Sequence, residues 1–233
     1  MSDAKIAGGS VFERYEEKYL LTEPQYQGLM AKLLEHMQQD RYGRHTICTV
    51  YYDTDDYAII RRCLEKPKFK EKLRLRSYGV PQADDTVYLE LKKKLAGVTY
   101  KRRVSLALCE AQDYLEKHLQ PAEQGQIFRE IDWFASQLPL KPRALVCYDR
   151  VALFGREDPN LRVTFDTNVR WRDHHLSLVE GDDGALLLAP GTSLMEIKTL
   201  RALPLWLVQA LSQYRIYPTS FSKYGTIYQE HLA

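Results

Sequence analysis

Lys72-Leu73-Arg74-Leu75-Arg76 alternates a cationic side chain with a leucine over five consecutive positions. Because successive side chains of a β-strand point to opposite faces, this stretch predicts a strand with one cationic and one apolar face. With 33 Lys and Arg among 233 residues, such a triplet arises by chance less than about once per chain. Taken alone, it fits a solvated sheet edge as well as a binding surface.

The same alternation recurs in at least five other stretches of the chain. They are Arg14-x-Glu16-x-Lys18, Glu90-x-Lys92-x-Lys94, Lys101-x-Arg103, Arg162-x-Thr164-x-Asp166 and Glu196-x-Lys198. The intervening residues are often apolar, although Arg102 interrupts that face between Lys101 and Arg103. Apolar faces need cover, most simply from helices, so the charged faces are predicted to converge on one shared concavity.

The predicted lining is strongly cationic although the whole chain carries a net charge of only +2. Its twelve cations and four acids give a local charge of about +8, and the acids are Glu16, Glu90, Asp166 and Glu196. The twelve cations are Arg14, Lys18, Lys72, Arg74, Arg76, Lys92, Lys101, Arg103, Arg150, Arg162, Lys198 and Lys223. Because burying one unpaired charge costs several kcal/mol, the concavity is predicted to be wide and water-filled. Triphosphate or polyphosphate is the kind of anion that it would attract.

Three of the acids, Glu16, Glu90 and Glu196, each lie two residues before a lysine. A groove that only bound phosphate would need no carboxylates on its cationic face. Carboxylate and phosphate oxygens are the ligands that Mn²⁺ and Mg²⁺ prefer, so the three glutamates are candidate metal ligands. The alternative is that they only neutralise the neighbouring cations.

Composition limits the classes of protein to consider. The four cysteines (Cys48, Cys63, Cys109 and Cys147) form no C-x-x-C pair, which predicts reduced, mostly packed thiols in a cytoplasmic protein. The sequence shows no secretory signal and no run of 18 apolar residues, so we expect no membrane span. We expect a loose arm over residues 1–10 and a single domain over residues 11–233.

Periodicity and turn signals predict an α+β fold with a largely antiparallel, closed sheet. Strands are expected at 11–21, 46–52, 71–78, 86–94, 98–106, 143–151, 161–169, 175–179, 185–188 and 192–198. Helices are expected from 22 onward and at 55–63, 109–119, 122–138, 204–214 and 222–232. Thr22-Glu-Pro-Gln25 has the residues of a capping box with proline in the first turn.

Several motifs together carry a family resemblance, by their order and number. They are Arg14–Tyr19, Val50–Thr54, Lys72–Gly79, Tyr88–Lys92, Lys101–Arg103, Tyr148–Arg150, Arg162–Asp166, Leu194–Lys198, Leu203–Trp206 and Ser220–Tyr224. This set resembles the triphosphate tunnel metalloenzyme superfamily, which includes the CYTH domains. Within it, the chain is similar to the catalytic domain of the vacuolar transporter chaperone (VTC) polyphosphate polymerases in its bacterial form.

The resemblance implies a closed eight-stranded antiparallel β tunnel with helices packed outside. It implies a cytoplasmic enzyme that transfers the γ-phosphate of ATP to a growing polyphosphate chain, with Mn²⁺ or Mg²⁺ bound at Glu196. Catalytic phosphate-holding roles are implied for Lys72, Arg74, Arg76, Lys92, Arg150 and Lys223. Further phosphate contacts are expected from Arg14, Lys18, Lys101, Arg103, Arg162 and Lys198, and further metal contacts from Glu16 and Glu90. CYTH proteins carry Glu-x-Glu-x-Lys where this chain has Arg14-x-Glu16-x-Lys18, which would weaken a second metal site.

Other functions stay open from the sequence. With water as the acceptor, the same site would be a tri- or polyphosphatase, and without turnover it would be a polyphosphate- or nucleotide-binding module. Nucleic-acid binding is disfavoured, because acids on the cationic face would repel a phosphodiester backbone and the sequence shows no evident aromatic platform. The pair His174-His175 is expected in a solvated loop, and Asp53, Asp55 and Asp56 as turn and capping residues.

Overall fold

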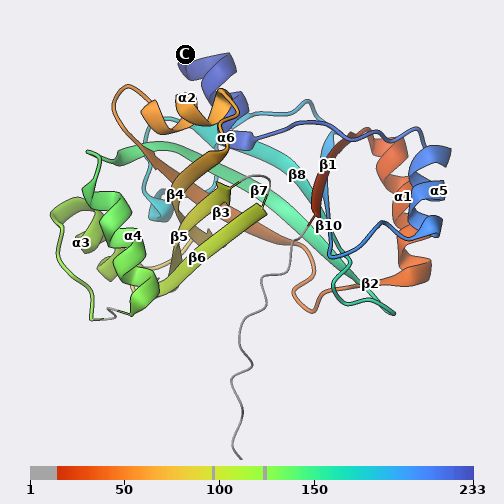
Figure 1. Cartoon of the computed structure of the whole chain (residues 1–233), viewed down its shortest axis with the longest axis horizontal. Coiled ribbons are helices and arrows are strands. Elements are labelled where there is room, and N and C mark those ends of the chain that lie inside the picture. The colour runs from red at the N-terminus through yellow and green to blue at the C-terminus, as the bar shows by residue number, and fades with distance from the viewer. Residues whose placement is uncertain (1–14, 96–97, 123–124) are drawn as a thin grey trace, which may run out of the picture.

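A computed structural model describes residues 15–95, 98–122 and 125–233 of the chain. The expected arm and Arg14 lie outside the described residues. Eight long strands pair in the order β1-β10-β8-β7-β3-β4-β5-β6, and all their ladders are antiparallel (Figure 1). Their bounds are β1 Tyr15–Leu21, β3 His45–Asp53, β4 Phe69–Tyr78, β5 Thr86–Leu95, β6 Val98–Ala107, β7 Lys141–Gly155, β8 Arg162–Arg172 and β10 Ser193–Thr199.

The expectation of a closed sheet of eight strands is not confirmed. The sheet has ten strands, because two short strands are added to the eight long ones. Each short strand pairs with the end of a long strand. β2 (Met37–Gln39) pairs with the end of β7, and β9 (Ala185–Leu186) pairs with the end of β8. No ladder joins the edge strands β1 and β6 within the described ranges. Instead, the Lys92 ammonium on β5 lies 3.7 Å from a carboxylate oxygen of Glu16 on β1, so an ion pair spans this side.

Helices cover the outer, apolar face of the sheet in three groups (Figure 1). The helices α1 (Glu23–His36) and α5 (Leu205–Gln213) lie beside β1 and β10, and α3 (Leu108–Lys117) and α4 (Gln126–Ser136) lie beside β5 and β6. The third group is α2 (Ala58–Leu64) with α6 (Lys223–Ile227), and a π-helical turn, Tyr228–Leu232, follows α6. Between these helices and the strands lie two hydrophobic clusters. The predicted helical cover is therefore confirmed.

The alternation in β4 and β5 has the predicted consequence for burial. Leu73 and Leu89 are fully buried in the larger outer cluster, so the cations between the leucines face the inner side of the sheet. Leu75 and Leu91 follow the same pattern. Because the apolar side chains take the helix-covered face, the inner face is left to charged groups and water.

The local helix signals are largely confirmed. Thr22 and Gln25 form the capping box at the start of α1. Asp53 is fully buried and accepts hydrogen bonds from the backbone N–H groups of Ile59 and Ile60 in α2, at 2.9 and 3.0 Å. Asp53 also accepts a bond from the Tyr224 hydroxyl at 3.1 Å, which joins the start of α2 to α6.

One predicted strand is wrong. The segment 175–179 contains a 3₁₀ turn, Leu178–Glu180, with Leu178 buried against the outer cluster. Leu176 and Leu178 anchor the segment to this cluster, the acidic residues and glycine that follow let it turn, and only the short β9 after them pairs with the sheet.

The four cysteines are free thiols, of which Cys109 is exposed and the other three are buried, as predicted. Among the described residues, none of the helices combines the length and the apolar character that crossing a membrane would need.

Candidate functional site

A cleft of about 740 Å³ follows the inner face of the sheet. Seven of the eight long strands, all except β8, contribute residues to it, together with the segment that precedes α6. Ten lysine and arginine side chains and the glutamates Glu16, Glu17 and Glu196 line it, an excess of seven positive charges. The cations are Lys18, Lys70, Lys72, Arg74, Arg76, Lys92, Lys94, Arg150, Lys198 and Lys223. The predicted concavity is therefore present, and its centre is charged.

The segment from Pro218 to Ser222 crosses one side of this cleft. Thr219 donates its backbone N–H to the Lys18 carbonyl at 2.7 Å, and the Lys18 ammonium donates to the Phe221 carbonyl at 2.9 Å. On the other side, the Lys72 ammonium donates to the Ser222 hydroxyl at 3.1 Å. The segment thus connects β1 to β4 and places Lys223, the first residue of α6, at the cleft.

Lys72 and Lys92 are cross-strand neighbours on β4 and β5, so two ammonium groups share one stretch of the cleft. No described carboxylate lies within 4.0 Å of the Lys72 ammonium. Burial lowers the pKa of Lys72, and burial together with nearby cations lowers the pKa of Lys92 to about 8 despite the opposing effect of Glu16. Both groups would gain from an incoming anion, because it would replace the lost solvation.

Arg150 and Lys223 are held by one buried acid. The guanidinium of Arg150 donates to both oxygens of Asp166, at 2.6 and 2.8 Å, and the Lys223 ammonium donates to the same carboxylate at 2.5 Å. Burial disfavours the charged form of Asp166, but these two cations outweigh it and hold its pKa below the usual range. The Tyr148 ring lies 4.1 Å from the Lys223 ammonium and 5.1 Å from the Arg150 guanidinium carbon. This arrangement fixes two cations in place while leaving one net positive charge.

Glu90 occupies a different environment from the other two candidate metal ligands. It is fully buried, and guanidinium groups contact both of its oxygens. Arg74 donates to Oε2 at 2.7 Å and Arg103 to Oε1 at 2.5 Å, while Arg76 and Lys101 lie within 3.7 and 3.6 Å. Burial opposes ionisation, but these cations keep the pKa of Glu90 well below its usual range. The geometry favours the counter-ion role that the sequence left open for Glu90.

Glu16 and Glu196 lie on the paired strands β1 and β10 as diagonal neighbours, two residues apart in register, and both line the cleft. Lys198 contacts the Glu196 carboxylate at 2.6 Å, and Lys18 lies 3.9 Å from each of the two glutamates. Burial raises the pKa of Glu196, but Lys198 and Lys18 more than offset this, so the group stays ionised.

This pair of glutamates fits a magnesium or manganese ion bound in the usual way, by one or two carboxylates together with substrate phosphates and water. No group of three or more His, Cys, Asp or Glu residues that could hold a metal occurs in the described part of the chain. An ion at this place would therefore depend on phosphate oxygens to complete its coordination.

Tyr51 lies within the cationic cleft, and the sequence did not single it out. Its ring stacks on Tyr224 with the centroids 4.7 Å apart. Burial raises the pKa of the Tyr51 phenol, but Arg74, Lys72 and other nearby cations outweigh this and lower it to about 8. The alternation of β3 could have placed Tyr51 on the inner face, because it is opposite Arg74 in the β3–β4 register.

The remaining predicted site residues fall into three groups. Lys18 and Lys198 line the cleft, whereas Lys101 and Arg103 pack around Glu90 beside it. Arg162 shares the register of Lys198 but lies at the exposed end of β8 and is not among the residues that line the cleft. Lys70 and Lys94 also line the cleft although neither was predicted as a site residue, and both extend the same i, i+2 series of cations.

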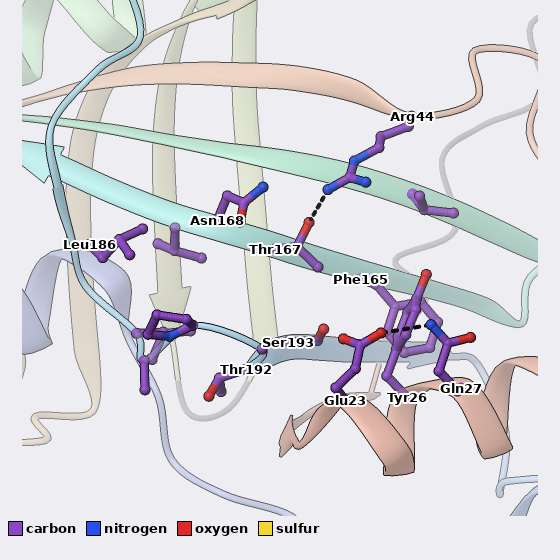
Figure 2. A pocket seen from close by; sticks show the side chains of 16 residues that line it. Glu23, Tyr26, Gln27, Arg44, Phe165, Thr167, Asn168, Leu186, Thr192 and Ser193 are labelled. Carbon is purple, nitrogen blue, oxygen red and sulfur yellow. Dashed lines mark hydrogen bonds between the residues drawn. The ribbon is translucent and has the colours of Figure 1, made fainter.

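A second cavity of about 390 Å³ lies on the outer face of the sheet, away from the cationic cleft. Figure 2 shows Tyr26 of α1 against Phe165 of β8, with Ser193 at the start of β10 nearby. The buried Ser193 hydroxyl has no hydrogen-bond partner among the described residues. This cavity lacks the concentration of cations found in the inner cleft.

The sequence of the chain matches a known protein family. A family model described as the VTC domain matches residues 13–231, nearly the whole chain. The chain belongs to the VTC domain family. The resemblance predicted from the strand motifs is therefore confirmed.

A curated relative of this VTC domain is the vacuolar transporter chaperone complex subunit 4 of Trypanosoma brucei brucei. It is 25% identical over 207 aligned residues, which cover 70% of this chain and 26% of that protein. The chain thus spans about a quarter of the length of this relative.

Solved structures share the fold at low sequence identity. A candidate adenylate cyclase from Bacillus halodurans has a TM-score of 0.57 and 14% identity, with 94% of this chain and 96% of that chain covered. A similar protein from Vibrio parahaemolyticus has a TM-score of 0.55 and 12% identity, with 94% and 99% covered. A candidate adenylyl cyclase from Hippeastrum, described as having a dominant triphosphatase activity, has a TM-score of 0.52 and 16% identity, with 93% and 95% covered.

Proposed function

We propose that this VTC domain transfers the γ-phosphate of ATP to the end of an inorganic polyphosphate chain inside the cationic cleft. The observation that supports this most is that ten cations line the same cleft as the glutamates Glu16 and Glu196. A site that only bound phosphate would be weakened by acids at its centre, whereas phosphoryl transfer benefits from a metal held next to the phosphates.

Each group in the cleft has a role in this proposal. Lys72, Lys92 and Lys223 supply ammonium groups that can follow the phosphates as they move, because lysine acts as a mobile point charge. Arg74, Arg76 and Arg150 supply guanidinium groups held by Glu90 and Asp166, so their donors are in place before the substrate binds.

Glu16 and Glu196 would hold Mn²⁺ or Mg²⁺, which when bound would neutralise charge on the phosphate oxygens. A terminal oxygen of the polyphosphate chain attacks the γ-phosphorus, the bond between that phosphorus and the β–γ bridging oxygen breaks, and ADP leaves with the bond's electron pair. The reaction needs no covalent intermediate on the protein. Cations along the cleft stabilise the charge on the attacking and leaving oxygens.

A triphosphatase or polyphosphatase is the second candidate. The side between β1 and β6 has no backbone ladder within the described ranges and is spanned by the ion pair of Lys92 with Glu16. Water could reach the γ-phosphate from this side and replace polyphosphate as the acceptor. The triphosphatase activity described for the Hippeastrum protein fits the same alternative.

Incubation of the purified chain with ATP and Mn²⁺, followed by a polyphosphate gel and a phosphate assay, separates these functions. Long chains together with ADP support the polymerase, and free phosphate without chains supports the hydrolase. Unchanged ATP with tight binding of tripolyphosphate would leave a binding module and remove both enzymatic proposals. A cytoplasmic location remains part of the proposal.

A further inference from the structure

Aromatic side chains gather where three inner strands end on the same side of the sheet. His45 begins β3, Tyr78 ends β4, and Tyr88 lies near the start of β5. The ring centroids of His45 and Tyr78 are 5.9 Å apart, and those of Tyr78 and Tyr88 are 5.6 Å apart. Tyr42, in the turn before β3, lies 6.3 Å from His45. We call these four residues the aromatic mouth.

The aromatic mouth continues the cationic inner face. Tyr88 is the register partner of Arg76, which lines the cleft, and Tyr78 follows Arg76 by two positions on the same strand. His45 is the register partner of Arg150, another cleft residue. Two residues of a strand span roughly 7 Å, so Tyr78 lies about one ribose unit along the strand from the cleft cation Arg76.

Arginine side chains connect the rings with the phosphate site. The guanidinium carbon of Arg103 lies 4.3 Å from the centre of the Tyr88 ring. The same guanidinium donates to the Tyr78 hydroxyl at 3.4 Å and to Glu90 at 2.5 Å. At the other end of the row, Arg41 lies 4.9 Å over Tyr42.

The two tyrosines that flank His45 are open to solvent. Tyr42 is 64% exposed and Tyr78 is 50% exposed, although burial of such rings contributes strongly to folding. Exposed rings beside arginine form a surface that suits a planar π system attached to a phosphate group. An inorganic phosphate chain has no group that would use such a surface.

We propose that the aromatic mouth is the subsite for the base of a nucleoside triphosphate, with the base stacked on Tyr78 and Tyr42 and the phosphates directed into the cationic cleft. The identity of the nucleotide as phosphate donor rests on the proposed function. The subsite distinguishes a nucleotide from inorganic tripolyphosphate. It favours purines over pyrimidines, because the larger ring system covers more of the tyrosine faces.

The test measures binding of Mg²⁺–ATP and of tripolyphosphate to the full chain by calorimetry, without turnover. In Tyr78→Ala and in the double variant Tyr42→Ala/Tyr78→Ala, ATP should bind about tenfold more weakly or worse, while tripolyphosphate affinity stays within about twofold. Tyr78→Phe should retain most of the ATP affinity, because it keeps the ring. Tyr100→Ala is the matched control, since Tyr100 is an exposed tyrosine opposite Lys93 on β5, out of register with the inner-face cations.

Equal losses for ATP and tripolyphosphate would overturn the subsite, because the rings would then only support the cations. Tighter binding of single-stranded oligo(A) than of ATP would overturn it in favour of a nucleic-acid surface. Unchanged ATP binding in the variants of an active polymerase would remove the base subsite alone. Selective loss of ATP binding in a chain without turnover would support the subsite and remove only the proposed polymerase.

Discussion

Two carboxylate environments on the inner face show how one sequence pattern serves two purposes. Glu90 has a side chain that is 0% exposed, and arginine contacts each of its oxygens. Glu16 and Glu196 have side chains that are 21% and 16% exposed, and all their cationic partners within 4.0 Å in the described residues are lysines. Each of the three glutamates precedes a lysine by two positions. Lys92, the lysine that follows Glu90, nevertheless forms an ion pair with Glu16 on β1.

The type of partner accounts for this difference. A guanidinium group offers a rigid set of donors that holds a carboxylate in place, whereas an ammonium group is a compact charge on a flexible stem. We infer that Glu90 is a structural counter-ion and that Glu16 and Glu196 are free to exchange their lysine contacts for a metal ion.

The largest effect is expected from Glu90→Gln. Removing this charge leaves Arg74, Arg76, Lys101 and Arg103 without their shared counter-ion. Loss of one partner from a buried ion cluster typically costs about 3–5 kcal/mol of the free energy of unfolding. Urea unfolding of the variant and of the unaltered chain measures this change.

The matched control is Glu130→Gln, which breaks the outer-face ion pair of Glu130 with Arg102. Because that pair is partly open to solvent, the expected loss is under about 1 kcal/mol. Equal losses in the two variants would contradict a special structural role for Glu90.

The next effect concerns turnover rather than stability. Glu196→Gln should lower metal-dependent turnover by roughly 100-fold or more, because the metal would lose a carboxylate ligand. The free energy of unfolding and the affinity for tripolyphosphate should change little, since Lys198 and Lys18 remain. Measurement of the initial rate against Mn²⁺ concentration, together with calorimetry, checks both parts.

Glu17→Gln is the control for this experiment, because Glu17 accepts a bond from the Tyr19 hydroxyl instead of contacting the cleft lysines. Normal turnover in the Glu196 variant would remove Glu196 from the metal site.

A smaller effect should follow from pH. Lys92 and Lys101 have pKa values lowered to about 8, chiefly by burial, and Tyr51 has a pKa lowered to about 8 by nearby cations. A bound polyanion favours the ammonium forms and the neutral phenol, so it raises all three pKa values and binding takes up protons. Affinity for tripolyphosphate should therefore be highest below pH 8 and fall above it, by at most about tenfold per pH unit for each group.

Calorimetry between pH 6.5 and 9.5 in buffers of different ionisation enthalpy measures the proton uptake. Lys92→Met should bind more weakly at low pH and show a shallower decline. An affinity that rises with pH would contradict this assignment.

The smallest effect is expected from Arg162→Ala. Arg162 lies at the exposed end of β8, outside the cleft lining, whereas Arg150 is bound to Asp166 within it. Affinity for tripolyphosphate should change less than about twofold in Arg162→Ala, as expected for a solvated charge. Arg150→Ala should lose considerably more in the same assay, and equal losses would extend the phosphate site to the end of β8.

Much of the fold could be predicted from the strand periodicity. The leucines of β4 and β5 had to find cover, so the helices had to lie outside and the cations inside. Closure of the sheet was not predictable, because it depends on whether the edge strands β1 and β6 pair, and no ladder joins them within the described ranges. The aromatic mouth was missed for a related reason: Tyr42 and His45 are more than 30 residues from Tyr78 and Tyr88 in the sequence, and the four meet only where three strands end together.

Which residues share a face follows from the sequence alone, because a strand alternates sides every residue and that rule needs no tertiary contact. Which charges became neighbours depended on how the strands came together in the fold. Ion pairing and burial depend on distances across strands, and these turned three similar Glu-x-Lys patterns into one buried counter-ion and two carboxylates at a cleft.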